Sequence, residues 1–240
     1  YFANLEWNGA VLREVEKPVP TRDFSSFEKY RDFLQSTLGR LHENLSAEGR
    51  RFPYRWLATI SSGYDGLATA VLARPQGLGE AISITEGRGG GSDSGETPSA
   101  MLGLSLSLIA RDDWRQTLLP EVPFFAADAK GEDVFLRGAE SHLVGRALLT
   151  GHYGIAWDKE VKGLSGGFER KDQAGLSLTE YRLWAGFLHC PIPFFGARQV
   201  QDIITLSHSP EMGPWDVGGS YNRPIPRRII ETAGIPRGSF

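Results

Sequence analysis

Apolar positions in the first half of the chain follow two alternating spacings. Residues 55–60, 80–85 and 104–109 are short segments, either apolar throughout or apolar at every second position, as strands are. Between them, residues 67–74 and a segment from Glu96 have helical composition and are bounded by proline or glycine. This order of strand, helix, strand, helix, strand is typical of a parallel sheet with right-handed crossovers. It predicts an α/β fold.

The remaining chain extends this pattern. A fourth strand is expected at residues 146–150, and residues 1–20 have no regular spacing. Further helices are expected at residues 25–47, 134–143, 178–188 and 227–233. We therefore predict a parallel, doubly wound sheet with a more irregular C-terminal part. Residues 1–50 should form an N-terminal segment and a helix that packs on the core, and residues 51–240 the main domain.

Composition restricts the classes of function. The chain has 240 residues, of which 40% are hydrophobic, enough for one large core. A net charge of −3 gives no overall reason to bind nucleic acid. No apolar run is long enough to cross a bilayer and no cationic leader is present, so we expect no membrane partner. The chain starts at Tyr1 rather than Met, which leaves room for an upstream domain or a partner subunit.

The single cysteine, Cys190, cannot form an internal disulfide. Its apolar neighbours, among them Phe187 and Ile192, favour a buried and inert thiol over a nucleophile. A chain with one cysteine fits a reducing compartment, and we expect a cytoplasmic protein.

The turn between the first strand and its helix is the leading candidate site. Ser61-Ser62-Gly63-Tyr64-Asp65-Gly66 follows a strand and opens a helix, whose first N–H groups lack partners and carry the positive end of the helix dipole. Phosphate binds such helix starts, because glycine admits close approach and serine adds hydroxyl donors. The alternative is that the two serines and Asp65 merely cap the helix.

This turn resembles the Ser-Gly-Gly-x-Asp-Ser motif of PP-loop ATP pyrophosphatases, most closely that of the asparagine-synthetase family. Leu148-Leu149-Thr150-Gly151-His152-Tyr153-Gly154 is similar to the second glycine-rich loop of that family. Tyr221-Asn222-Arg223-Pro224-Ile225-Pro226-Arg227-Arg228 looks like the ending of asparagine-synthase-related proteins. The resemblance covers roughly residues 50–240.

The resemblance implies an adenine nucleotide α-hydrolase-like fold that binds ATP and Mg²⁺. The pyrophosphate would lie on Ser61–Gly66, with Gly151, His152 and Gly154 in the second loop, and Asp65 would act in catalysis by orienting the turn or helping to hold magnesium. A carboxylate would attack the α-phosphorus, giving an acyl-adenylate and pyrophosphate, and an amine would then displace AMP. The partners would be the nucleotide and a small carboxylate or amine substrate.

Three positions depart from the family pattern. Ser62 stands where the family has a glycine, Gly66 where it has its last serine, and Ile155 where it has an acid. The loss of a donor and of an acid predicts weak or unusual catalysis, whereas a cradle of backbone N–H groups survives such changes. The metal ligands stay unassigned. The alternative function is a degenerate, non-catalytic nucleotide-binding or scaffolding module.

Other segments have two interpretations each. The glycine-rich residues 87–95, with Asp93, would face adenine and ribose or form a loose surface loop. Residues 163–175 would form a lid or a plain loop, and one of Lys159, Lys162 and Lys171 could contact the leaving phosphate. A further group of basic residues could clamp an anion or pair with acids of the same domain: Arg223, Arg227, Arg228 and Arg237.

Overall fold

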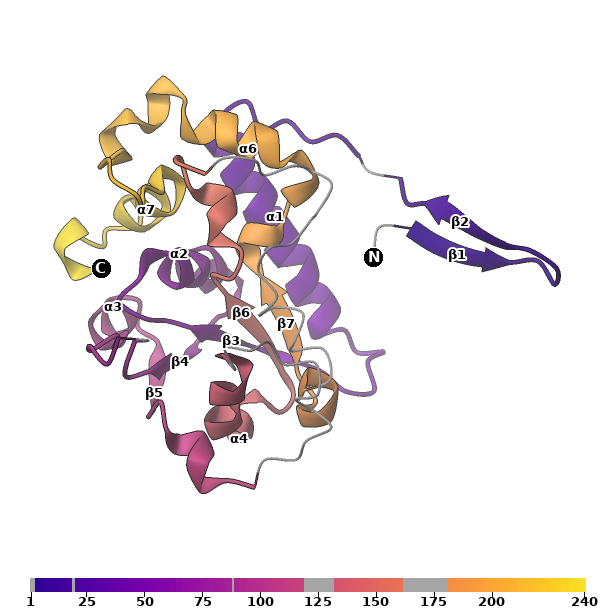
Figure 1. The fold of residues 1–240 in the computed structure, drawn as a ribbon, viewed down its shortest axis with the longest axis horizontal. Coiled ribbons are helices and arrows are strands. Elements are labelled where there is room, and N and C mark those ends of the chain that lie inside the picture. The colour runs from indigo at the N-terminus through magenta and orange to yellow at the C-terminus, as the bar shows by residue number, and fades with distance from the viewer. Residues whose placement is uncertain (1–2, 19, 88, 119–131, 162–180) are drawn as a thin grey trace.

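The computed structural model of the chain describes residues 3–18, 20–87, 89–118, 132–161 and 181–240 (Figure 1). The expected lid at 163–175, with Lys162 and Lys171, lies outside the described residues. None of the helices in the described part has the length and hydrophobicity that crossing a bilayer requires.

Five parallel strands form the central sheet. They are β3 (Arg55–Thr59), β4 (Glu80–Ile84), β5 (Ser105–Ile109), β6 (Arg146–Thr150) and β7 (Leu188–Pro191), in the order β5-β4-β3-β6-β7. The four expected strands and their parallel order are confirmed. β7 was not expected, since this segment was predicted to end a helix. Pro191 pairs with Thr150 at the sheet edge, where a residue without an N–H is tolerated.

Helices cover both faces of the sheet, as a doubly wound arrangement requires (Figure 1). Because side chains alternate along β3, Trp56 and Ala58 pack toward one face and Leu57 toward the other. The first face is covered by α1 (Phe27–Leu45), α2 (Tyr64–Ala73), α6 (Val200–Ser207) and α7 (Pro224–Thr232). The second is covered by the 3₁₀ segment η4 (Glu132–Ala139), α4 (Glu140–Leu143) and residues 181–185.

The expected N-terminal helix is α1, and it packs on this core. Ser26 caps it by accepting a hydrogen bond from the Lys29 N–H. Leu34 and Leu38 lie one turn apart on its buried stripe and are fully buried. Burying each such leucine contributes about 2 kcal/mol to stability.

Several element boundaries differ from the predictions. The helix expected at 134–143 is mostly the 3₁₀ segment η4, in which Gly138 approaches Asp113 so closely that a Cβ would lie 2.8 Å from the Asp113 Cβ. The helix expected at 178–188 is helical at 181–185, and Leu188 already belongs to β7. α7 begins at Pro224, earlier than expected, because proline is compatible with a first helical turn. The short helix expected from Glu96 is confirmed as α3 (Glu96–Met101), and it ends just before Gly103, whose φ is +62°.

The expectation of an irregular N-terminus was wrong. β1 (Ala3–Trp7) and β2 (Leu12–Glu16) form an antiparallel hairpin, and Asn8 makes its turn by accepting hydrogen bonds from the N–H groups of Ala10 and Val11. The hairpin projects away from the sheet and its helices (Figure 1). The apolar positions of β1 alternate with polar ones, but β2 breaks the pattern, since Glu14 and Glu16 lie on the same face as Leu12.

Candidate functional site

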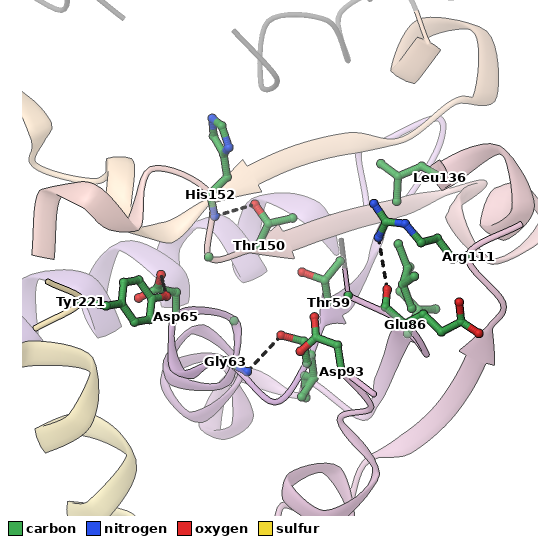
Figure 2. Close-up of a pocket in the computed structure, with 17 residues that line it drawn as sticks. Thr59, Gly63, Asp65, Glu86, Asp93, Arg111, Leu136, Thr150, His152 and Tyr221 are labelled. Carbon is green, nitrogen blue, oxygen red and sulfur yellow. Dashed lines mark hydrogen bonds between the residues drawn. The ribbon is translucent and has the colours of Figure 1, made fainter. Parts of the chain in front are cut away.

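A cavity of about 360 Å³ opens at the carboxyl ends of the strands (Figure 2). From β3 the chain passes to β4 and β5 on one side and then to β6 and β7 on the other. The crevice between β3 and β6 is therefore the topological switch point, where open α/β sheets bind ligands. The lining residues are Thr59, Ile60, Ser61, Gly63, Asp65, Gly66, Ile82, Ile84, Glu86, Gly87, Asp93, Arg111, Leu136, Thr150, Gly151, His152 and Tyr221.

The predicted anion turn lines this cavity. Gly63 is the N-cap of α2, and within the described residues no side chain caps the helix. The Ser61 hydroxyl accepts a hydrogen bond from the Gly63 N–H at 3.1 Å, and the Ser62 hydroxyl donates to Asp93 at 2.6 Å. The interpretation that the serines and Asp65 cap the helix is therefore wrong. The first backbone N–H groups of α2 therefore have no side-chain cap from the described part of the chain.

Asp93 ties the glycine-rich loop to this turn. Its carboxylate accepts hydrogen bonds from both the N–H and the hydroxyl of Ser62, and its own N–H donates to the Thr85 carbonyl at 3.0 Å. Ser61 also forms an isolated bridge with Ser94. Residues 92–95 are thus held against the turn rather than forming a loose surface loop.

Three glycines are required by close approaches between elements. A Cβ at Gly66 would lie 2.7 Å from the Thr59 carbonyl oxygen, so the serine of the family motif could not fit here without a shift. A Cβ at Gly151 would lie 2.6 Å from the Asp65 carbonyl carbon. At Gly154 it would lie 2.6 Å from the Asp65 Cγ. The second glycine-rich loop is therefore packed directly against the start of α2.

Asp65 points away from the helix N–H groups and into a charged cluster. Its Oδ2 forms an ion pair with Arg223 and accepts a hydrogen bond from the Tyr221 hydroxyl at 3.1 Å. Arg223 also contacts the Asp158 carboxylate at 3.4 Å. Burial raises the pKa of Asp65 to about 6, although Arg223 and Tyr221 both act to lower it. Its Oδ1 is buried without a hydrogen-bond partner among the described residues.

The C-terminal segment forms one wall of the site. The Tyr221 ring stacks on Tyr64 with 4.8 Å between ring centroids, and the Tyr64 hydroxyl donates to the Tyr221 carbonyl at 2.6 Å. The Arg227 guanidinium lies 4.6 Å from the Tyr64 ring centroid. Of the four C-terminal arginines, Arg223, Arg228 and Arg237 pair with acids of the same chain. For these three arginines, the structure therefore favours pairing with acids of the same domain over clamping an anion.

The far wall comes from positions to which the motifs assigned no role in binding. Thr59 and Thr150 end β3 and β6, and Arg111 follows β5 and donates to the Glu86 carbonyl at 3.1 Å (Figure 2). Their place at strand ends is a signal that could have identified them. His152 lines the cavity, but its imidazole points away from Thr59 and Gly63 (Figure 2).

The remaining predicted residues do not converge on the cavity. Ile155 is 39% exposed and is not among the lining residues, and Lys159 pairs with Asp216. Cys190 is half-buried, and burial raises the pKa of its thiol to about 11, which disfavours a nucleophilic thiolate. In the described part of the chain, no three His, Cys, Asp or Glu side chains are grouped to hold a metal ion.

Comparisons with known proteins found no protein-family model that matches this chain and no curated protein similar to it.

Proposed function

We propose that this chain is an ATP-binding domain of the PP-loop type, with the triphosphate on the Ser61–Gly66 turn. The observation that carries this proposal is the start of α2, which lines the cavity at the sheet's switch point without a side-chain cap from any described residue. Such a helix start combines free N–H donors with the positive end of the dipole. The cavity volume of about 360 Å³ lies in the range of small-molecule sites.

The other walls suit the rest of a nucleotide. Ile82, Ile84 and Leu136 supply apolar surface on the side of β4, where the base would lie. Arg111 stands beside them, and its guanidinium lies 4.0 Å from the centroid of the Phe135 ring, which orients a positive charge at that wall. An adenine nucleotide α-hydrolase-like assignment accounts for this division into a phosphate side and a base side.

The reaction proposed from the resemblance is adenylation of a small carboxylate with release of pyrophosphate, with the Asp65 carboxylate orienting the turn or helping to hold magnesium. Its Oδ1, which has no hydrogen-bond partner among the described residues, is the atom through which it would bind a cation. Magnesium would supply charge neutralisation between the phosphates. Asp65 would have to loosen its ion pair with Arg223 to contribute fully.

A second candidate, a nucleotide-binding module without turnover, is favoured by one observation. The Arg223 guanidinium sits between the carboxylates of Asp65 and Asp158, where it already neutralises the acid that a metal would need. Binding by backbone N–H groups does not need that acid, whereas transfer chemistry depends on it.

The binding proposal is tested by placing a charge at the turn. A Cβ at Gly63 would have one close neighbour, the Ser61 hydroxyl at 3.3 Å, and the Gly63 φ of −80° suits any residue. A small shift of that hydroxyl accommodates Gly63→Glu and Gly63→Gln equally. Calorimetric titration with ATP should give an affinity at least about tenfold weaker for Gly63→Glu than for the isosteric, neutral Gly63→Gln, because a carboxylate at the helix start repels phosphate. Equal affinities would place the nucleotide elsewhere, and no binding by the wild type would remove the proposal.

The two candidates separate in a second experiment. ATP affinity and pyrophosphate release are measured with magnesium and with a chelator. Magnesium-dependent release supports the adenylating enzyme, whereas binding in both conditions without release supports the module. Arg223→Gln provides the internal comparison, since it frees Asp65 and should make ATP binding more dependent on magnesium.

A further inference from the structure

The N-terminal hairpin carries a face with large apolar side chains that no other described part of the chain covers. Cross-strand partners share a face of a hairpin, and the register pairs Trp7 with Leu12 and Leu5 with Glu14. Leu5, Trp7 and Leu12 are 70%, 64% and 58% exposed. Glu14 and Glu16 lie on the same face toward the hairpin's open end. We name these five residues the arm face: it is apolar at the turn end and acidic at the other.

An uncovered hairpin of this kind is energetically unfavourable. Residues 4–18 are all exposed, and the hairpin stands clear of the sheet and helices (Figure 1). Two strands alone are marginally stable in water, and large apolar side chains such as Trp7 gain most of their stabilisation from burial. The arm face therefore requires a surface that buries it.

A groove on the body has the complementary chemistry. It measures about 390 Å³ and lies between α1 and the segment after β7. Its floor is apolar and includes Phe33, Phe194 and Phe195, while Arg22, Arg40 and Arg198 are also among its lining residues. Its described lining has no acidic residue. We name it the Phe33 groove.

The arm cannot easily reach the groove of its own chain. Pro20 lines the groove, and Lys17, Pro18 and Val19 separate it from the end of β2 at Glu16. To lay the hairpin back on its own body, the chain would have to reverse within these residues. Pro18 and Pro20 oppose that reversal, because each fixes its own φ and restricts the residue before it. The groove of another molecule is under no such restriction.

We propose that two copies of this chain form a dimer by exchanging their arms, so that each arm face lies in the Phe33 groove of the other copy. Trp7 and the leucines fill the phenylalanine floor, and Glu14 and Glu16 meet the arginines of the groove. The exchange is reciprocal, as a twofold symmetric interface requires. It stands independently of nucleotide binding.

A charge-swap experiment tests this assignment. One variant carries Glu14→Arg with Glu16→Arg on the arm, and the other carries Arg22→Glu with Arg40→Glu in the groove. Each alone should raise the dimer dissociation constant by at least about tenfold, because like charges meet in both contacts. An equimolar mixture should dimerise again, since the basic arm meets the acidic groove and the second contact is wild-type. Sedimentation measures the state of each.

Two controls keep the outcome interpretable. Glu43→Arg with Glu48→Arg reverses two exposed acids outside the arm and groove, and should leave the dimer unchanged. Thermal melting verifies that every variant folds. A monomeric wild type would overturn the proposal. A second outcome would also overturn it. The two variants would stay monomeric when mixed, and a single chain carrying all four changes would regain the fluorescence of a buried Trp7. The arm would then dock on its own body.

Discussion

The two glycine-rich loops that meet at the cavity look alike in sequence but use their glycines in opposite ways. At Gly63, after β3, an added Cβ would meet only the Ser61 hydroxyl, at 3.3 Å, and this side chain can shift by the few tenths of an ångström required. At Gly151 and Gly154, after β6, a side chain would strike Asp65. The first loop presents N–H groups to the cavity, and the second packs behind them. Glycine content alone therefore does not identify the loop that binds.

The two loops also differ in charge. The start of α2 carries the positive end of a helix dipole toward the cavity. Behind it, Arg223 balances Asp65 and Asp158, which lies just beyond the second loop. Tyr153 in that loop has φ of +68°, which is uncommon for a residue with a side chain, and its ring packs edge-on against Phe194. The second loop is thus held by tertiary contacts. Substitutions in it should affect the stability of the protein more than its binding of a ligand.

The largest expected effect follows from paired alanine substitutions. Gly151→Ala should lower the free energy of unfolding by about 3 kcal/mol, because its Cβ would lie 2.6 Å from backbone atoms of Asp65 and Gly66 that cannot move aside. Gly63→Ala, the matched control in the other loop, should change it by less than about 0.5 kcal/mol. Denaturant unfolding measures both. Similar losses at the two sites would contradict the proposed difference between the loops.

The second largest loss of stability is expected when the Arg223 guanidinium, which lies between two carboxylates, is removed. Arg223→Gln leaves Asp65 and Asp158 facing each other in a nearly buried site, and should cost about 2 kcal/mol after allowance for the partial exposure of the pair. Arg237→Gln is the control, since it removes an arginine whose side chain is 47% exposed and pairs with Glu231. It should lower the free energy of unfolding by clearly less than Arg223→Gln does, because exposed ion pairs contribute little. If both variants unfold at the same denaturant concentration, the cluster does not support the site.

The pH dependence of stability should reveal Asp65. Its pKa is raised by burial from 3.8 to about 6, so the folded state holds this proton more tightly than the unfolded state. The ionised carboxylate therefore destabilises the fold, and the penalty grows as pH rises from about 4 to about 6. Between these pH values, the free energy of unfolding of the wild type should fall by up to about 2 kcal/mol relative to that of Asp65→Asn, and it should change little outside them. Melting curves of both proteins across this range measure the difference, and parallel curves would refute the assignment.

The smallest expected effect concerns the tether between the glycine-rich loop and the turn. Asp93→Ala removes the carboxylate that accepts from the Ser62 hydroxyl and shares the Ser62 N–H with the Asp93 carbonyl, and should cost about 1 kcal/mol, since this contact is exposed. Because only the backbone contacts between the loop and the turn then remain, hydrogen exchange at Ser62 and Gly63 should become faster. Exchange at Gly151 and Gly154 should be unaffected, since the second loop has its own contacts. Faster exchange in both loops would mean that they open as one unit.

Much of the fold could be predicted because its signals are local. The apolar spacing of residues 55–60 and 80–85, with glycine or proline after each helix, was enough to place β3, β4 and α2 and to expect them in a parallel sheet. The turn that opens α2 was selected for the same reason. Strand period, helix period and turn chemistry depend on neighbouring residues alone.

Tertiary structure decided the rest. Asp65 and Arg223 are 158 positions apart, so no local pattern could indicate that they form one ion pair. The sequence of β7 predicts the end of a helix, and only its pairing with β6 at the edge of the sheet makes it a strand. The role of Gly66 depended on the distance to Thr59, a contact made when α2 folds back over β3. The sequence by itself determined which segments are strands and helices, whereas the packing of those segments determined which charges meet, because long-range contacts form only once the elements have been assembled.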